Sequence, residues 1–124
     1  MKIGFTVGVW DVWHRGHEDF LRRAREQCDY LVVGVMTDYW VRVQKGHNRP
    51  AESLAKRMEN VRSHADKVVA LDTLDMTSYL QIADVWIKGA DQKNMRPEHW
   101  PCVYLPRTPG ISSSQLIEAM KGTA

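Results

Sequence analysis

The feature that most constrains the fold is an alternation of buried-strand and amphipathic-helix patterns, visible from the first residues onward. Residues 2–9 (KIGFTVGV) and 30–36 (YLVVGVM) are apolar and rich in β-branched side chains, which predicts strands covered on both faces. Between them, a helix pattern begins at Gly16, with charged residues between its apolar positions. These apolar positions are Phe20, Leu21, Ala24 and Cys28. Two strands joined by a helix predict a parallel pair with a right-handed crossover.

The same alternation continues through the rest of the chain. Further strands are predicted at residues 67–71, 84–88 and 102–105, and further helices at about 51–64, 76–83 and 112–121. Residues 39–50 read as a polar connection, because Lys45-Gly46 and Arg49-Pro50 act as breakers. We therefore predict one α/β domain over residues 1–124, a single Rossmann-like doubly wound domain with a parallel five-stranded sheet. Ligands of such sheets bind at the carboxyl ends of the strands.

Composition limits the classes of partner. The chain has 124 residues, 26% of them charged, and a formal net charge of +2, which is too small to indicate a nucleic-acid partner. The run Arg22-Arg23-Ala24-Arg25 is better explained as a charged outer helix face, because it lacks interleaved aromatic residues. No apolar run approaches the roughly 20 residues that span a bilayer, so no membrane partner is expected. Cys28 and Cys102 lack metal-site spacing, and we expect reduced, packed thiols in a cytoplasmic protein.

The turn after the first strand carries the strongest functional signal. Gly8 ends the strand, where a missing side chain would let a ligand approach the backbone. His14 and His17 lie three residues apart at the start of the helix, with Gly16 between them, so both imidazoles can point at one spot. The N-terminus of a helix also favours anions, through its N–H groups and its dipole. Together these features predict a phosphate site.

Two other readings of this turn compete with phosphate binding. A metal site made of Asp11, His14 and His17 would lack a typical fourth ligand and zinc-like spacing, so no dedicated metal site is predicted. The two histidines could alternatively be packed or surface residues without a ligand. The order G-x-x-D-x-x-H-x-G-H directly after a strand favours phosphate, because phosphate binding gives each of these residues a role.

This turn resembles the H-x-G-H signature of the nucleotidyltransferase superfamily that contains cytidylyltransferases and small adenylyltransferases. The resemblance implies that His14 and His17 stabilise the pentavalent transition state at the α-phosphate. It also implies that the whole turn contacts the nucleotide, through Gly8, Val9, Trp10, Asp11, His14, Arg15, Gly16 and His17. Two roles stay open for Asp11, which could hold a metal indirectly or orient a histidine.

The turn before the last predicted helix is a second candidate anion site. Ser112 followed by Gln115 fits a capping box, so the hydroxyls of residues 112–114 would gather at a helix N-terminus. Arg107 would add a fixed cation with a planar set of donors. An ordinary polar turn and helix cap would explain this segment alone equally well.

The segment closely resembles the R-T-E-G-I-S-T signature of the glycerol-3-phosphate cytidylyltransferases, although Pro109 replaces the glutamate and Ser113 the threonine. The second change keeps a hydroxyl, whereas the first removes a charge. The resemblance implies that Arg107 binds phosphates. It further implies nucleotide contacts from Thr108, Pro109, Gly110, Ile111, Ser112, Ser113 and Ser114.

The middle of the chain offers weaker candidates. By resemblance, Lys45 is expected to bind the triphosphate, with Arg42 or Arg49 as a second cation, although a solvated loop lysine is the competing reading. Asp91 either orients a substrate hydroxyl or caps a turn. Arg57 loosely resembles an arginine on the second helix of the family.

The predicted reaction transfers CMP from CTP to a small phosphorylated alcohol, with glycerol 3-phosphate favoured, and gives CDP-glycerol and pyrophosphate. His14, His17, Lys45 and Arg107 are the predicted catalytic donors, and Mg²⁺ is expected to accompany the triphosphate. The resemblance also suggests a homodimer. Alternatives are an adenylyltransferase that uses ATP with another acceptor, a nucleotide-binding module without activity, and a nucleic-acid binder.

Overall fold

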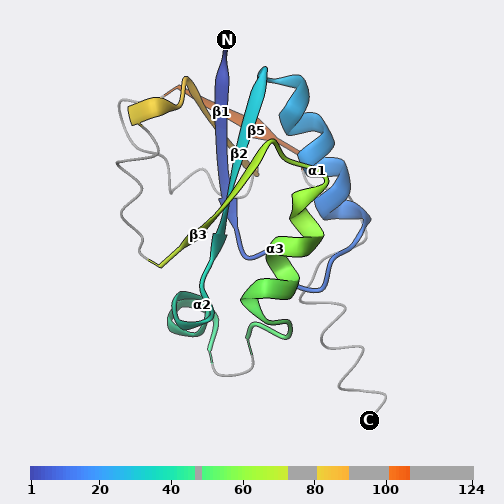
Figure 1. The fold of residues 1–124 in the computed structure, drawn as a ribbon, viewed down its shortest axis with the longest axis vertical. Helices are drawn as coiled ribbons and strands as arrows, with labels where there is room; N and C mark the ends of the chain where they lie inside the picture. Colours follow the sequence, from blue (N-terminus) through green and yellow to red (C-terminus); the bar gives the residue numbers. More distant parts are fainter. Residues whose placement is uncertain (47–48, 73–80, 90–100, 107–124) are drawn as a thin grey trace.

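The computed structural model describes residues 1–46, 49–72, 81–89 and 101–106, with the side chains of residues 44 and 45 left aside. Five strands form one parallel sheet in the order β3-β2-β1-β4-β5 (Figure 1). The strands are β1 (Ile3–Gly8), β2 (Tyr30–Met36), β3 (Lys67–Leu71), β4 (Val85–Gly89) and β5 (Cys102–Leu105). The helices are α1 (Arg15–Glu26), α2 (Asp38–Lys45) and α3 (Leu54–Arg62). The predicted α/β class and the five-stranded parallel sheet are confirmed.

The sheet has its topological switch point between β1 and β4. From β1 the chain runs outward through β2 to β3, and it then returns to place β4 on the other side of β1. In open sheets of this kind, ligands bind outside the carboxyl ends of the strands at such a point. The loop that follows β1 therefore begins at the position where a ligand is expected.

Each face of the sheet has its own apolar cluster. Alternate strand residues such as Val33 and Ile87 pack with Leu21 of α1 and Val61 of α3, so both helices cover the same face (Figure 1). The residues between them, including Trp86, belong to a second cluster on the opposite face. The histidine loop and α1 thus lie on a defined side of the sheet, and the side chain of Trp86 lies on the other.

The prediction of an irregular connection over residues 39–50 is wrong, because Asp38–Lys45 form the helix α2. Val41 is fully buried, and its N–H donates to the carbonyl of Thr37 at 3.1 Å. Gly46 ends the helix with a φ of 97°, a conformation that favours glycine. The breakers seen in the sequence therefore terminate a short helix; they do not exclude one.

The second predicted helix starts later than expected, at Leu54, with Ser53 as its N-cap. Residues 51 and 52 stay outside the helix because their backbone N–H groups donate to the carboxylate of Asp11. The strand predicted at 84–88 is shifted by one residue, since Asp84 instead accepts a hydrogen bond from the N–H of Ile3. The strands predicted at 67–71 and 102–105 have the observed bounds. The helix predicted at 112–121 and most of the one at 76–83 lie outside the described residues.

The arginine-rich run forms the outer face of α1, as predicted. Ala24 is fully buried, while Arg22, Arg23 and Arg25 pair with nearby carboxylates. Cys28 and Cys102 are half-buried thiols that do not form a disulfide, and burial raises the pKa of Cys28. Within the described ranges, no helix combines the length and apolarity needed to cross a bilayer.

Candidate active site

The loop after β1 has an unusual backbone. Trp10 and Val12 have φ values of 57° and 48°, in the left-handed region that a β-branched residue such as Val12 rarely adopts. Two contacts hold this loop: the indole Nε1–H of Trp10 donates to the carbonyl of Gly34 at 3.0 Å, and Glu52 Oε1 accepts from Val12 N at 2.8 Å. Residues from two other segments, β2 and the stretch before α3, thus fix the loop that leads to the histidines.

The side-chain space beside Gly8 is occupied by Trp10. A Cβ at this position would lie 3.0 Å from Cε2 of the Trp10 indole, so the indole occupies the space that the missing side chain leaves. Trp10 itself is only 6% exposed. The Trp10 indole thus packs against Gly8, and the predicted contact of Gly8 with the nucleotide stays a prediction.

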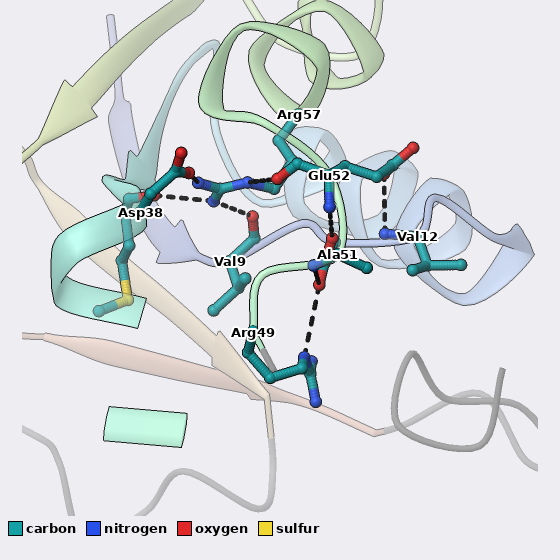
Figure 2. A network of polar contacts seen from close by, with 9 residues as sticks. Val9, Val12, Asp38, Arg49, Ala51, Glu52 and Arg57 are labelled. Atoms are coloured by element: carbon teal, nitrogen blue, oxygen red, sulfur yellow. Dashed lines mark hydrogen bonds and ion pairs between the residues drawn. The ribbon is translucent and has the colours of Figure 1, made fainter. Parts of the chain in front are cut away.

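Asp11 fastens a distant segment to the loop. Its carboxylate is fully buried and accepts from the N–H groups of Ala51 at 2.7 Å and Glu52 at 2.9 Å. Arg49 Nε also donates to it, at 3.4 Å, and the Arg49 side chain is 13% exposed. Figure 2 shows residues 49–52 folded against the loop that carries Val12. The structure thus gives Asp11 a scaffolding role beyond the two that the sequence left open.

Arg57 joins the carboxyl ends of the two central strands. Its side chain is fully buried and donates to the carbonyls of Val9 at 2.8 Å, Met36 at 2.7 Å and Glu52 at 3.1 Å. It also forms an ion pair with Asp38, the first residue of α2 (Figure 2). Arg57 is therefore part of the framework under the site. Its resemblance to a family arginine identified the position, but the sequence did not reveal these contacts.

The two histidines are held as a stacked pair. His14 is the N-cap of α1, and its Nδ1 accepts from Gly16 N at 2.9 Å. His17 Nδ1 accepts from His14 N at 3.3 Å, and the ring centroids lie 3.9 Å apart with 24° between the planes. Because Nδ1 is the acceptor in both rings, each neutral imidazole carries its proton on Nε2 and is a donor there. The two rings thus lie together, as their three-residue spacing predicts.

His17 is held in its neutral form. Burial and, to a lesser extent, the nearby His14 lower its pKa to about 3, while Asp11 opposes the shift. Trp13 stacks on His17 at 5.2 Å between centroids, and it also stacks with His64 at 5.1 Å. The edge of Trp10 closes another side at 5.7 Å. Sequence reasoning missed Trp13 and His64, because His64 comes from beyond the end of α3 and no local pattern joins them.

This arrangement can bind a phosphate through neutral donors. The Gly16 N–H, one of the first N–H groups of the helix, is engaged by His14, and the imidazole Nε2–H groups are additional donors at this end of α1. The dipole of α1 still favours negative charge there. A pair of fixed donors in a partly buried setting suits an oxyanion whose charge grows during a reaction.

The structure places only part of the predicted site. Lys45 is the last residue of α2, Arg42 is exposed on the same helix, and Arg49 lies beside Asp11. Asp91 and residues 107–114 lie outside the described residues, so the second predicted turn stays a prediction. Among the side chains that the structure describes, no group of three His, Cys, Asp or Glu is arranged to hold a metal ion.

The comparisons with known proteins agree on one family. A family model described as cytidylyltransferase-like matches residues 5–104. The chain is 43% identical over 96 residues to the bifunctional protein HldE of Rhodospirillum rubrum, which covers 73% of this chain and 19% of that protein. It is 40% identical over 117 residues to the ethanolamine-phosphate cytidylyltransferase of Dictyostelium discoideum, covering 89% of this chain and 32% of that protein. The chain thus spans less than a third of the length of these curated relatives.

Solved structures agree on the fold. A lipopolysaccharide core biosynthesis protein from Thermoplasma volcanium superposes with a TM-score of 0.70 at 22% identity, covering 87% of this chain and 97% of that one. A protein of unknown function from Archaeoglobus fulgidus gives a TM-score of 0.67 at 17% identity, covering 85% and 89%. At these identities the likeness concerns the fold alone.

The parallel sheet and its switch point define an α/β protein of the Rossmann-like class. Within that class, the chain belongs to the cytidylyltransferase-like family, whose model matches 100 of its 124 residues (5–104).

Proposed function

We propose that this protein transfers CMP from CTP to a small phosphorylated alcohol, with glycerol 3-phosphate as the first acceptor to test. The observation that carries the proposal is the stacked pair His14 and His17, which presents two neutral donors at the opening of α1. The relative named ethanolamine-phosphate cytidylyltransferase supports an acceptor of this chemical class. The sequence resemblance of residues 107–113 to a cytidylyltransferase signature supports CTP.

In the proposed reaction, a phosphate oxygen of the acceptor attacks the α-phosphorus of CTP. A new P–O bond forms as the bond from the α-phosphorus to the bridging oxygen breaks, and pyrophosphate leaves with the electron pair. His14 and His17 donate from Nε2 to the α-phosphate oxygens, where hydrogen bonds strengthen as negative charge accumulates. Lys45 and Arg107 would neutralise the remaining phosphate charge. No protein nucleophile takes part.

The lowered pKa of His17 fits this role. An imidazole that stays neutral keeps its Nε2–H for donation at physiological pH, and it does not bind the triphosphate simply as a cation. Fixed neutral donors stabilise a charge that grows in the transition state without equally stabilising the ground state. Binding of the ground-state triphosphate would then rest more on the cationic side chains.

Mg²⁺ would accompany the triphosphate and neutralise charge on the leaving pyrophosphate. The carboxylate of Asp11 faces backbone N–H groups, and the described residues offer no three-ligand group of their own. Mg²⁺ typically keeps several waters and binds through substrate phosphates, which fits this setting. We also propose a cytoplasmic homodimer, as the family resemblance suggests; light scattering of the purified protein tests the oligomeric state.

ATP is the second candidate nucleotide. The HldE proteins, whose name specifies no cytidylyl transfer, are up to 43% identical to this chain. The named cytidylyltransferase is 40% identical, so the similarity to relatives does not single out CTP. Pro109 also breaks the signature that favours cytidine.

The test measures pyrophosphate release with each nucleoside triphosphate, Mg²⁺ and a panel of phosphorylated alcohols and sugars. The proposal expects turnover with CTP and glycerol 3-phosphate or a similar alcohol phosphate. Turnover with ATP and not CTP would establish the second candidate. Release with no pair in the panel would overturn the assignment of a transferase activity.

A further inference from the structure

Two buried polar atoms stand out within the described part of the chain, because the structure gives them no hydrogen-bond partner. They are the ammonium Nζ of Lys88 and the hydroxyl of Tyr104. Lys88 is only 2% exposed. Buried polar groups are nearly always hydrogen-bonded, and a buried ammonium without a partner is especially unfavourable. One physical explanation for such unpartnered groups is a ligand that binds to them.

The two atoms belong to the same small region. Lys88 on β4 and Tyr104 on β5 are direct partners in the parallel register, so their side chains lie on the same face of the sheet. Two residues earlier on each strand, Trp86 and Cys102 pack in the cluster opposite α1 and α3. The ammonium of Lys88 lies over the Trp86 ring, 4.3 Å from its centroid.

The surroundings of Lys88 leave its charge only partly compensated. A cation over an aromatic ring is stabilised, but the ring accepts no conventional hydrogen bond. Burial lowers the pKa of Lys88, and Cys102 is the nearby group that opposes this shift. The ammonium therefore keeps its capacity to donate to an anion, and the flexible lysine stem allows it to turn from the ring.

The position of this pair suits a reactant. Lys88 is the next-to-last residue of β4, which borders β1 at the switch point, and the histidine loop begins where β1 ends. The histidines open α1 on one side of the sheet, whereas Lys88 and Tyr104 project on the other. An anion held by Lys88 would therefore lie near the switch point, at the end of the sheet where the histidine loop begins.

We propose that Lys88 and Tyr104 form the subsite for the phosphate of the acceptor substrate, with the ammonium and the phenol hydroxyl as its donors. This inference rests on the proposed function, since it names the part of the site that receives the attacking phosphate. A phosphate of the nucleotide offers the same chemistry, so the test separates the two sources.

The test compares Lys88→Met and Tyr104→Phe with the unaltered protein, measuring KM for acceptor and for nucleotide separately. We expect Lys88→Met to raise the acceptor KM by about tenfold to a hundredfold, and Tyr104→Phe by roughly threefold to tenfold, with nucleotide KM changed less than about twofold. Lys67→Met, which removes an exposed lysine from the edge strand β3, is the matched control and should leave both values unchanged. A rise in nucleotide KM alone would overturn the acceptor assignment.

A second readout does not depend on turnover. Inorganic phosphate and glycerol 3-phosphate should each raise the melting temperature of the unaltered protein, and Lys88→Met should reduce that rise, leaving only the part that binding at the histidines contributes. Without ligand, Lys88→Met should melt at the same or a higher temperature, because an unpartnered buried ammonium has been removed. Equal phosphate-induced shifts in both proteins would overturn the subsite. Tyr104→Phe removes one oxygen and keeps the test valid if the lysine variant folds poorly. If no nucleotide pair turns over, the phosphate shift still decides whether the subsite exists.

Discussion

The buried polar groups on the two sides of β1 differ in whether they have hydrogen-bond partners. On the β2 side, Asp11 and Arg57 are buried and form several hydrogen bonds each to backbone groups of other segments. On the β4 side, the ammonium of Lys88 and the hydroxyl of Tyr104 are buried on neighbouring strands without hydrogen-bond partners. In the first region the hydrogen bonds are satisfied within the protein, and they fix the histidine loop. In the second region two donors remain for the phosphate of the proposed ligand. Stability and ligand binding should therefore respond to mutations in different regions.

The largest expected effect concerns the histidines themselves. His14→Ala and His17→Ala should each lower kcat by about a hundredfold to a thousandfold or more, because each removes a donor aimed at the growing charge. Steady-state pyrophosphate release measures this, and circular dichroism checks the fold. His14→Asn is the matched control, since asparagine keeps a good N-cap for α1 but loses the imidazole Nε2–H. Activity in His14→Asn near that of the unaltered protein would show that His14 acts only as a cap.

Removing Arg57 should give the largest loss of stability. Arg57→Met would leave the Val9, Met36 and Glu52 carbonyls without their donor, and Asp38 without its cation. We expect the free energy of unfolding to fall by roughly 2–5 kcal/mol, measured by urea denaturation. Arg62→Met on the same helix, at its C-terminal end, serves as control. Equal stabilities of the two variants would contradict the framework role of Arg57.

Asp11→Asn should have a smaller effect on stability, of about 1–3 kcal/mol, because an amide can replace only part of the acceptor capacity used by residues 49–52. The decisive comparison is between melting curves with and without Mg²⁺. A framework role predicts that Asp11→Asn lowers the melting temperature equally with and without Mg²⁺. A loss that appears only in the presence of Mg²⁺ would indicate that Asp11 acts on a metal.

A further prediction concerns pH. Since the pKa of His17 is about 3 in the folded protein and about 6.5 in the unfolded chain, the unfolded state binds the proton more readily between those values. The contribution of His17 to stability is therefore complete above about pH 6.5 and is lost as the pH falls towards 3. NMR titration of the imidazoles should show one ring that stays neutral down to about pH 4. Trp13→Ala should raise the pKa of His17 by exposing its imidazole ring. An unchanged pKa would show that the stacking on Trp13 does not cause the shift.

Sequence patterns predicted the strands and the histidine pair because both depend on local periodicity. The strand at 67–71 and the three-residue spacing of His14 and His17 needed no long-range information. The helix α2 was missed because its eight residues include few buried positions, of which Val41 is one, and adjacent breakers dominated the pattern.

The framework contacts could not be read from the sequence for a different reason. Asp11 meets residues 51 and 52 across a separation of 40 positions, and Trp13 meets His64 only after α3 has packed on the sheet. Lys88 is a similar case, because a lysine at the end of a strand predicts an exposed charge, and only the register with Tyr104 and the ring of Trp86 reveals a buried one.

The most direct test of the central claim is ³¹P NMR of CTP, Mg²⁺ and glycerol 3-phosphate incubated with the unaltered protein and, in parallel, with His14→Asn. The proposed role of the stacked histidines predicts that CDP-glycerol and pyrophosphate signals grow with the unaltered protein, and at least about a hundredfold more slowly with the variant. Equal product formation by both proteins would contradict the claim that the stacked histidines stabilise the transferred phosphate.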